Sequence, residues 1–276
     1  MAVAAVALVG CGGIGAASAS SPRHDRPATP ISDDDAHSRL PGPQPPAPAR
    51  AGLRVPILMY HYIREPPNPN DRVGVRLSVR PGDFKAELDW LQANGYRTIT
   101  FADLAAALTG SRTLPPKAVI LTFDDGYEDF FTTAVPNLRD HGFDAVAYVV
   151  TGFIGRPGYL TRDQVVQLDR DELVEIGSHT QNHLDLTAVS AAQLRSEVAG
   201  SRAFLEELLG HEVLDFCYPA GRFNPAVVRA VQAAGYRDAT TTAFGAWHSY
   251  GDRLAWTRVR VSGGEGLDEF ARKVAG

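Results

Sequence analysis

Short apolar runs alternate with longer amphipathic stretches from Gly52 to Gly276. Apolar runs bounded by turn residues predict buried strands, and apolar residues at helical spacing behind Ser, Thr, Asp or Asn caps predict helices. The predicted strands lie near Pro56–Tyr60, Arg97–Thr100, Ala118–Phe123, Asp144–Val150, Val174–Gly177, Asp215–Tyr218, Asp238–Thr242 and Thr257–Val261. The predicted helices are Pro81–Asn94, Phe101–Leu108, Tyr127–His141, Thr161–Asp171, Ser190–Leu209, Asn224–Ala234 and Leu267–Val274. This repeated alternation predicts an α/β protein with a parallel sheet or barrel of about eight strands in a single domain.

The first 51 residues have a different character. The apolar run from Ala2 ends in Leu8-Val9-Gly10-Cys11, which resembles a bacterial lipoprotein signal cleaved before its cysteine. We expect residues 1–11 to be this signal, with Cys11 as the lipid anchor. The run is short and lacks a preceding Lys or Arg, so an unmodified or mis-started terminus is the alternative. Residues 12–51 contain eight prolines and no aromatic residue, which predicts a disordered Pro-rich tether before the folded domain, residues 52–276.

Charge and cysteine content narrow the class of protein further. The chain has 27 basic and 32 acidic residues and a net charge of −5, so we expect no nucleic-acid partner. The two cysteines, Cys11 and Cys217, are too few for a disulfide-rich scaffold or a thiolate zinc cluster. Any bound metal ion must therefore use histidine and carboxylate ligands.

Two adjacent carboxylates, Asp124 and Asp125, end the most apolar predicted strand and are followed by Gly126. Side chains of neighbouring residues diverge where a strand ends. One carboxylate can therefore bind a cation while the other faces a water molecule, as metal-assisted hydrolysis requires. A helix cap is the alternative, but it accounts for one aspartate and not for both.

Two histidines four residues apart, His179 and His183, follow the predicted strand that ends at Gly177. At this spacing both rings can reach one ion. Together with the acidic pair they form an Asp/His/His set, which leaves one coordination position open and is typical of a catalytic zinc site. In a parallel barrel the strand ends meet at one face, where we also expect His61 and the turn around Pro219.

The Thr122–Gly126 segment and His179-Thr180-x-x-His183 resemble the first two motifs of the polysaccharide deacetylase family, carbohydrate esterase family four. The resemblance spans residues 52–276 and implies a distorted (β/α) barrel of about seven to eight strands. It implies that Asp125, His179 and His183 are ligands of a divalent metal, zinc before others, and that Asp124 is the general base.

The third motif of the family reads Arg-x-Pro-Tyr, and here Cys217 replaces the arginine that orients the catalytic aspartate. The resemblance implies that Arg222 or Arg258 supplies this charge and that the backbone N–H of Ala220 binds the oxyanion. The late motif that carries the general acid is missing. The segment Met59-Tyr60-His61 resembles one in the poly-glucosamine exopolysaccharide deacetylase branch, so His61 is the predicted general acid.

Further residues are expected to assist in acid catalysis or to contact the substrate. His248 is the reserve candidate for the general acid, whereas a supporting role at the barrel mouth is the alternative for His61. The expected substrate contacts are Tyr218, Pro219, Arg222 and Trp247, with Trp256 and Tyr250 as further candidates for stacking on sugar rings or for a place in the core. Cys217 is expected to be a small buried group.

The resemblance implies a metal-dependent hydrolase that removes N-acetyl groups from a cell-wall or extracellular polysaccharide. The expected polymers are peptidoglycan, a chitin-like chain or poly-N-acetylglucosamine. An O-acetyl esterase or small-amide hydrolase that uses the same site is one alternative, and a glycan-binding module without turnover is another. The predicted signal implies a location at the extracellular face of the cell membrane, held by the N-terminal lipid, or otherwise secretion.

Overall fold

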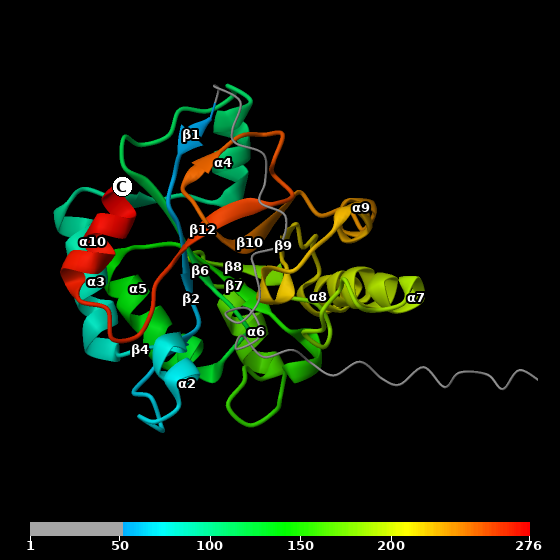
Figure 1. Ribbon diagram of the computed structural model, residues 1–276, viewed down its shortest axis with the longest axis horizontal. Coiled ribbons are helices and arrows are strands. Elements are labelled where there is room, and N and C mark those ends of the chain that lie inside the picture. The colour runs from blue at the N-terminus through cyan, green and yellow to red at the C-terminus, as the bar shows by residue number, and fades with distance from the viewer. Residues whose placement is uncertain (1–51) are drawn as a thin grey trace, which may run out of the picture.

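Seven parallel strands form a closed barrel in the computed structural model, which describes residues 52–276 (Figure 1). The predicted signal, tether and lipid anchor Cys11 lie outside the described residues. The hydrogen-bonded order is β2-β12-β10-β9-β8-β7-β6, and β6 pairs in turn with β2. The barrel strands are β2 (Ile57–Tyr60), β6 (Ala118–Phe123), β7 (Ala145–Val149), β8 (Val174–Ser178), β9 (Asp215–Cys217), β10 (Asp238–Phe244) and β12 (Trp256–Arg260). The predicted barrel of seven to eight strands is therefore confirmed.

An eighth strand lies beside the barrel. β5 (Arg97–Thr98) pairs with the beginning of β6, whereas β7 pairs with the end of β6. Two pairs of two-residue strands are additions that the sequence pattern did not predict, because such short segments show no periodicity. They are β1 (Leu53–Arg54) with β11 (Trp247–His248), and β3 (Tyr62–Ile63) with β4 (Ser78–Val79).

Side chains alternate between the inside and the outside of the barrel along each strand. In β6, Ala118 and Ile120 belong to the cluster inside the barrel, whereas Val119, Leu121 and Phe123 pack outward against the helices. The ring of Tyr148 fills the interior opposite Gly177, where an added Cβ would lie 2.6 Å from that ring. The interior is thus a packed core, and its carboxyl-terminal end can support rigidly held polar groups.

Helices cover the barrel, and one closes its amino-terminal end. In α4, Phe101, Leu104 and Ala105 pack on the interior cluster beside β1 (Figure 1). A capping box between Thr100 and Asp103 starts this helix. The helices are α2 (Arg72–Leu77), α3 (Pro81–Ala93), α4 (Phe101–Leu108), α5 (Val135–His141), α6 (Arg162–Asp169), α7 (Ala191–Arg195), α8 (Ser201–Leu209), α9 (Pro225–Ala233) and α10 (Leu267–Ala275). Except for α2, all of them fall within predicted helices or extend one by a single residue.

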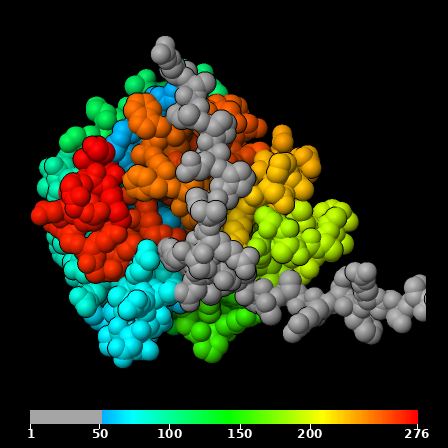
Figure 2. All heavy atoms as spheres, in the orientation of Figure 1, coloured from blue at the N-terminus to red at the C-terminus, as the bar shows by residue number. Residues whose placement is uncertain are grey.

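Two predicted helices contain π-helical turns, η1 (Phe130–Ala134) before α5 and η3 (Ser196–Gly200) between α7 and α8. The carboxyl-terminal helix α10 lies beside α3, and Phe270 contacts Trp90 edge to face at 5.8 Å. Figure 2 shows this red helix within one continuous surface next to the cyan segment of the chain. Among residues 52–276, no helix has both the length and the apolar character needed to cross a membrane.

Candidate metal-dependent active site

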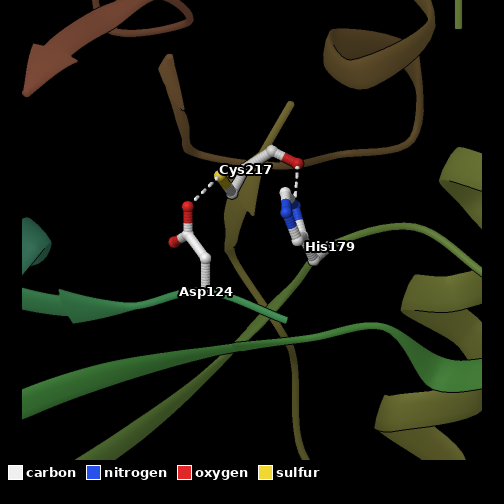
Figure 3. Close-up of side chains that lie close together, drawn as sticks. All are labelled: Asp124, His179 and Cys217. Carbon is white, nitrogen blue, oxygen red and sulfur yellow. Dashed lines mark hydrogen bonds between the residues drawn. The ribbon is translucent and has the colours of Figure 1, made fainter. Parts of the chain in front are cut away.

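The three sequence motifs meet at the carboxyl-terminal end of the barrel. Asp124 and Asp125 directly follow β6, His179 directly follows β8, and Cys217 is the last residue of β9. Figure 3 shows Asp124, His179 and Cys217 pointing toward one another from these three strands. Closure of the barrel brings together residues that are up to 93 positions apart in the chain. The predicted gathering of these motifs at one face is therefore what the structure shows.

Asp125, His179 and His183 form a candidate metal site, the metal triad. The Oδ1 atom of Asp125 lies 3.5 Å from Nε2 of His179 and 3.4 Å from Nε2 of His183, and all three side chains are buried. The Nδ1 atom of His179 lies 2.8 Å from the carbonyl oxygen of Cys217. A proton on Nδ1 donates to that oxygen and leaves the Nε2 lone pair directed at Asp125, as a metal-binding histidine requires. The donor set of one carboxylate and two imidazoles fits a divalent cation.

The backbone is strained at this end of the barrel. Within residues 52–276, four residues other than glycine have a positive φ: Asp125 (74°), Thr180 (69°), His183 (53°) and Ala220 (50°). Each belongs to one of the three motifs. Left-handed conformations are unfavourable for residues with a Cβ and persist where surrounding contacts hold them, which is common at functional sites.

Glu197, a residue that the sequence analysis missed, fixes the loop that carries His183. Its Oε2 atom accepts hydrogen bonds from the backbone N–H groups of Gln181 (3.1 Å) and Asn182 (2.8 Å), and Oε1 accepts one from Nδ2 of Asn182 (2.7 Å). The hydroxyl of Thr180 accepts a further bond from the backbone N–H of His183 at 3.0 Å. No local sequence signal marks Glu197, because it reaches this loop from the π-helical turn η3.

Asp124 is held by Arg258, which extends from β12 into the barrel. The two guanidinium Nη atoms donate to the two carboxylate oxygens at 2.7 and 2.6 Å, and both side chains are buried. Nε of Arg258 donates to the carbonyl of Thr241, and Nη1 also donates to the hydroxyl of Thr122. Burial would raise the pKa of Asp124, but the charge and hydrogen bonds of Arg258 keep it below its ordinary value. Asp124 is therefore a carboxylate in a fixed orientation.

Arg258 is therefore the charge partner of Asp124, a role for which the sequence offered Arg222 and Arg258. The other candidate, Arg222, donates instead to Asp185 at 2.8 Å. Cys217, where the family has arginine, is buried with its Sγ 3.7 Å from Oδ2 of Asp124 (Figure 3). Burial raises the pKa of the Cys217 thiol, so the group stays neutral.

Asp124, His179 and Cys217 also place their ligand atoms close enough for a metal ion. Nη2 of Arg258 lies 3.2 Å from Sγ of Cys217 and 2.6 Å from Oδ2 of Asp124. Because a guanidinium cation already lies against these groups, a second cation there would be repelled. The triad of Asp125, His179 and His183 is the better metal site.

His61 also lies near Asp124. It follows β2 directly, is buried, and places Nε2 3.9 Å from Oδ2 of Asp124. The structure therefore brings this histidine to the same end of the barrel as the metal triad. Pro219 and Ala220 also reach this end, in the short 3-10 turn η4 (Pro219–Gly221) that follows β9.

Three residues that the sequence predicted for the site lie away from the metal triad. Tyr218 points out of the barrel into the core, where its hydroxyl donates to the carbonyl of Leu254 at 2.8 Å. Trp247 is exposed on β11 and pairs with Arg54 at the amino-terminal end of β2, opposite the site. His248 is buried at the same end, where Nε2 lies 2.9 Å from the carbonyl of Val55, and burial lowers its pKa to about 4. Trp247 and His248 follow strand β10 in the sequence, but the sequence does not show that their segment returns to the amino-terminal end of the barrel.

Fold and site together define a β/α-barrel protein with a candidate divalent-metal centre beside a buried carboxylate–arginine pair. A family model described as polysaccharide deacetylase matches residues 111–239. A protein of Bacillus subtilis (strain 168) named "Putative polysaccharide deacetylase YxkH" is 34% identical over 76% of this chain and 72% of its own length. The chain belongs to the polysaccharide deacetylase family.

Two further relatives are informative. The poly-beta-1,6-N-acetyl-D-glucosamine N-deacetylase of Escherichia coli (strain K12) is 28% identical over 72% of this chain, and the match spans 36% of that longer protein. The solved structure of the Streptococcus pyogenes deacetylase PplD in complex with acetate superposes with a TM-score of 0.74 at 27% identity. It covers 81% of this chain and 99% of that chain. Both relatives are named as deacetylases, and the PplD structure carries the same barrel.

Proposed function

We propose that this protein removes N-acetyl groups from glucosamine units of an acetylated polysaccharide. The observation that carries the proposal is the arrangement of Asp124, which Arg258 holds as a carboxylate, beside the triad of Asp125, His179 and His183. A base next to a metal site at the mouth of a barrel suits hydrolysis of an acyl group. The names of the relatives support N-acetylated sugar polymers as the substrate class.

We infer that Asp125, His179 and His183 hold a divalent cation, zinc before others, since two imidazoles and one carboxylate are ligands that zinc prefers. When bound, such a cation polarises a carbonyl group and lowers the pKa of a water molecule. The hydrogen bond from His179 to the Cys217 carbonyl keeps the histidine ring in the tautomer that this role needs.

The remaining chemistry belongs to side chains of the chain itself. Asp124 accepts a proton from the attacking water, whose oxygen adds to the carbon of the acetyl group. The backbone N–H of Ala220, in its strained left-handed conformation, donates to the developing oxyanion. His61 gives a proton to the nitrogen as the C–N bond breaks, so that acetate and a free amino sugar leave. At 3.9 Å from Asp124, His61 can then regain a proton and restore both groups.

The polymer in question is peptidoglycan, a chitin-like chain or poly-N-acetylglucosamine. A lipid at Cys11 would hold the barrel at the extracellular face of the membrane, next to such polymers. This anchor lies outside the described residues and stays a prediction. Labelling of cells with a palmitate analogue, comparing the chain with its Cys11→Ser variant, tests it.

The test of the activity is acetate release from N-acetylglucosamine oligomers. We expect the purified full chain to release acetate, to lose this activity with a chelator, and to recover it when zinc is added. Asp125→Asn should lower kcat by at least about a hundredfold and weaken metal binding, because it removes the charged ligand. Asp140→Asn, at an exposed carboxylate on α5, is the matched control.

Two outcomes contradict the proposal. Acetate release that persists with a chelator and in Asp125→Asn would show that the triad is not the active site. Failure to release acetate from any oligomer, with metal bound and with acetyl esters hydrolysed, would favour an O-acetyl esterase.

A further inference from the structure

The turn η4, Pro219–Gly221, carries the backbone N–H of Ala220, and we call it the oxyanion turn. It packs directly on β10. The hydroxyl of Thr242 donates to the carbonyl of Ala220 at 3.3 Å. A Cβ added to Gly221 would lie 2.6 Å from the backbone nitrogen of Thr242, and Gly221 has a φ of 67°. Only glycine allows this close approach, so β10 holds one side of the turn.

An ion pair holds the other side of the oxyanion turn. Arg222 directly follows the turn, and its Nη1 atom donates to Oδ2 of Asp185 at 2.8 Å. Asp185 lies two residues after His183, and its Oδ1 atom accepts hydrogen bonds from the backbone N–H and the hydroxyl of Thr187. The two side chains of the pair are only 18% and 19% exposed, so water screens their charges less than at an open surface. The pair therefore joins the oxyanion turn to the loop that carries a metal ligand.

The backbone of the turn couples Arg222 to Ala220. The N–H groups of Gly221 and Arg222 donate to the carbonyls of Tyr218 and Pro219 at 2.9 and 3.0 Å. Between them, Ala220 has a left-handed conformation, with φ 50° and ψ 21°, which persists only where contacts hold it. Because these hydrogen bonds close a tight turn, a displacement of Arg222 also displaces Ala220. The place of the Ala220 N–H relative to the metal triad thus depends on the ion pair.

We propose that Asp185 and Arg222 are positioning residues, whose ion pair sets the distance between the backbone N–H of Ala220 and the metal triad. The pair then acts on the oxyanion that forms during attack, whereas the sequence predicted Arg222 as a contact for the substrate. This inference rests on the proposed function, because it concerns the oxyanion donor of the same site. An interaction made only in the transition state changes kcat, whereas one made equally with bound substrate changes KM.

A double-mutant cycle tests the pair. Asp185→Asn and Arg222→Gln each remove one charge and keep a side chain of similar size. With the N-acetylglucosamine tetramer as substrate, we expect kcat to fall about 5- to 20-fold in each variant, with KM and metal content within about twofold of wild type. The combined variant should be no slower than the slower single variant, because either change already breaks the pair. Asp89→Asn, in the exposed ion pair with Lys85 on α3, is the matched control.

A second measurement reports on the oxyanion donor itself. A tetramer with a methylphosphonamide group in place of one N-acetyl group presents a tetrahedral, negatively charged group where the oxyanion forms. Its Kd, measured by calorimetry, should rise in Asp185→Asn and in Arg222→Gln by about the factor by which kcat falls. The Kd of the unmodified tetramer should stay within about twofold of wild type.

Three results would overturn the proposal. A higher KM with unchanged kcat in Arg222→Gln would mean that Arg222 contacts the sugar. Loss of bound metal in Asp185→Asn, measured by metal analysis, would mean that Asp185 supports His183 instead. Rate losses that multiply in the combined variant would show that the two residues act independently.

Failure of the proposed function gives a different result. In that case the wild-type protein hydrolyses an acetyl ester, such as 4-nitrophenyl acetate, but releases no acetate from any N-acetylglucosamine oligomer. The ester forms the same kind of oxyanion, so lower kcat values on it in Asp185→Asn and Arg222→Gln would still support the positioning role. Wild-type kcat values on the ester in both variants would overturn it.

Discussion

At the scale of single residues, the Asp124–Arg258 pair explains how the site works without the arginine of the third motif. The two hydrogen bonds run from both Nη atoms of Arg258 to both carboxylate oxygens, which fixes the carboxylate plane as well as its charge. Cys217, which stands where the third motif has arginine, is buried, and Arg258 also contacts its sulfur. The arginine that orients the base Asp124 therefore comes from β12, and not from the third motif at the end of β9.

The substitution Arg258→Lys tests this orientation. Lysine keeps the positive charge but cannot donate two parallel hydrogen bonds, so we expect kcat to fall about 10- to 100-fold while KM and metal content stay near wild type. Steady-state kinetics on N-acetylglucosamine oligomers and metal analysis measure this. Arg139→Lys, at an exposed ion pair on α5, is the control. Wild-type kcat in Arg258→Lys would show that Asp124 needs no such orientation.

At the scale of elements, the loops after β7 and β8 and the turn η3 act as one unit around His183. The backbone N–H groups of Thr151 and Gly152 donate to the carbonyls of Thr180 and Gln181, so the two loops are joined directly. Glu197 then binds the far side of the same loop. Because several contacts meet here, the strained conformations of Thr180 and His183 can persist.

We expect Glu197→Gln to weaken metal binding about 10-fold or more, because an amide cannot accept all three hydrogen bonds with the strength of a carboxylate. The Kd for zinc, from competition with a chromophoric chelator, measures the effect, and far-UV circular dichroism checks the fold. Glu207→Gln, exposed on the neighbouring helix α8, is the matched variant. Equal zinc affinity in both variants would mean that the loop holds His183 without Glu197.

At the scale of the whole molecule, buried carboxyl groups couple stability to pH. Glu87 on α3 accepts a hydrogen bond from the Tyr60 hydroxyl at 3.0 Å, and burial raises its pKa to about 8. Inside the barrel, burial and the neighbouring Asp238 raise the pKa of Asp215 to about 8, although Arg237 bonds to both carboxylates. The folded state therefore holds protons that the unfolded chain releases above about pH 4.

The sign of the pH dependence follows from this difference. Since the folded state binds more protons, the contribution of these groups to stability is largest below about pH 4 and is lost as pH rises toward about 8. Glutamine at position 87 stays neutral, so we expect Glu87→Gln to be about 1–3 kcal/mol more stable than wild type at pH 8.5 and similar to it at pH 5. Urea unfolding at both pH values measures this. If the free energy of unfolding fell by the same amount from pH 5 to pH 8.5 in Glu87→Gln and in wild type, the prediction would be contradicted.

The sequence by itself determined the elements of the barrel and the ends of its strands. The apolar run Ala118–Phe123 is one strand with the predicted bounds, and α4 covers the predicted Phe101–Leu108. Both are local properties, because burial on two faces and helix caps are encoded within a few residues. The same local order puts Asp124, Asp125 and His179 directly after strands, which is why a parallel barrel had to bring them together.

The tertiary structure alone decided which distant side chains complete the site. Arg258 reaches Asp124 across 134 residues, and the sequence left Arg222 as an equal candidate, although that residue pairs with Asp185. Glu197 gave no sequence signal, and Trp247 and His248 lie at the opposite end of the barrel because β11 pairs with β1. The periodicity of a chain reflects which face of an element is buried. Side-chain contacts across a barrel depend on strand order, register and closure, which no local pattern encodes.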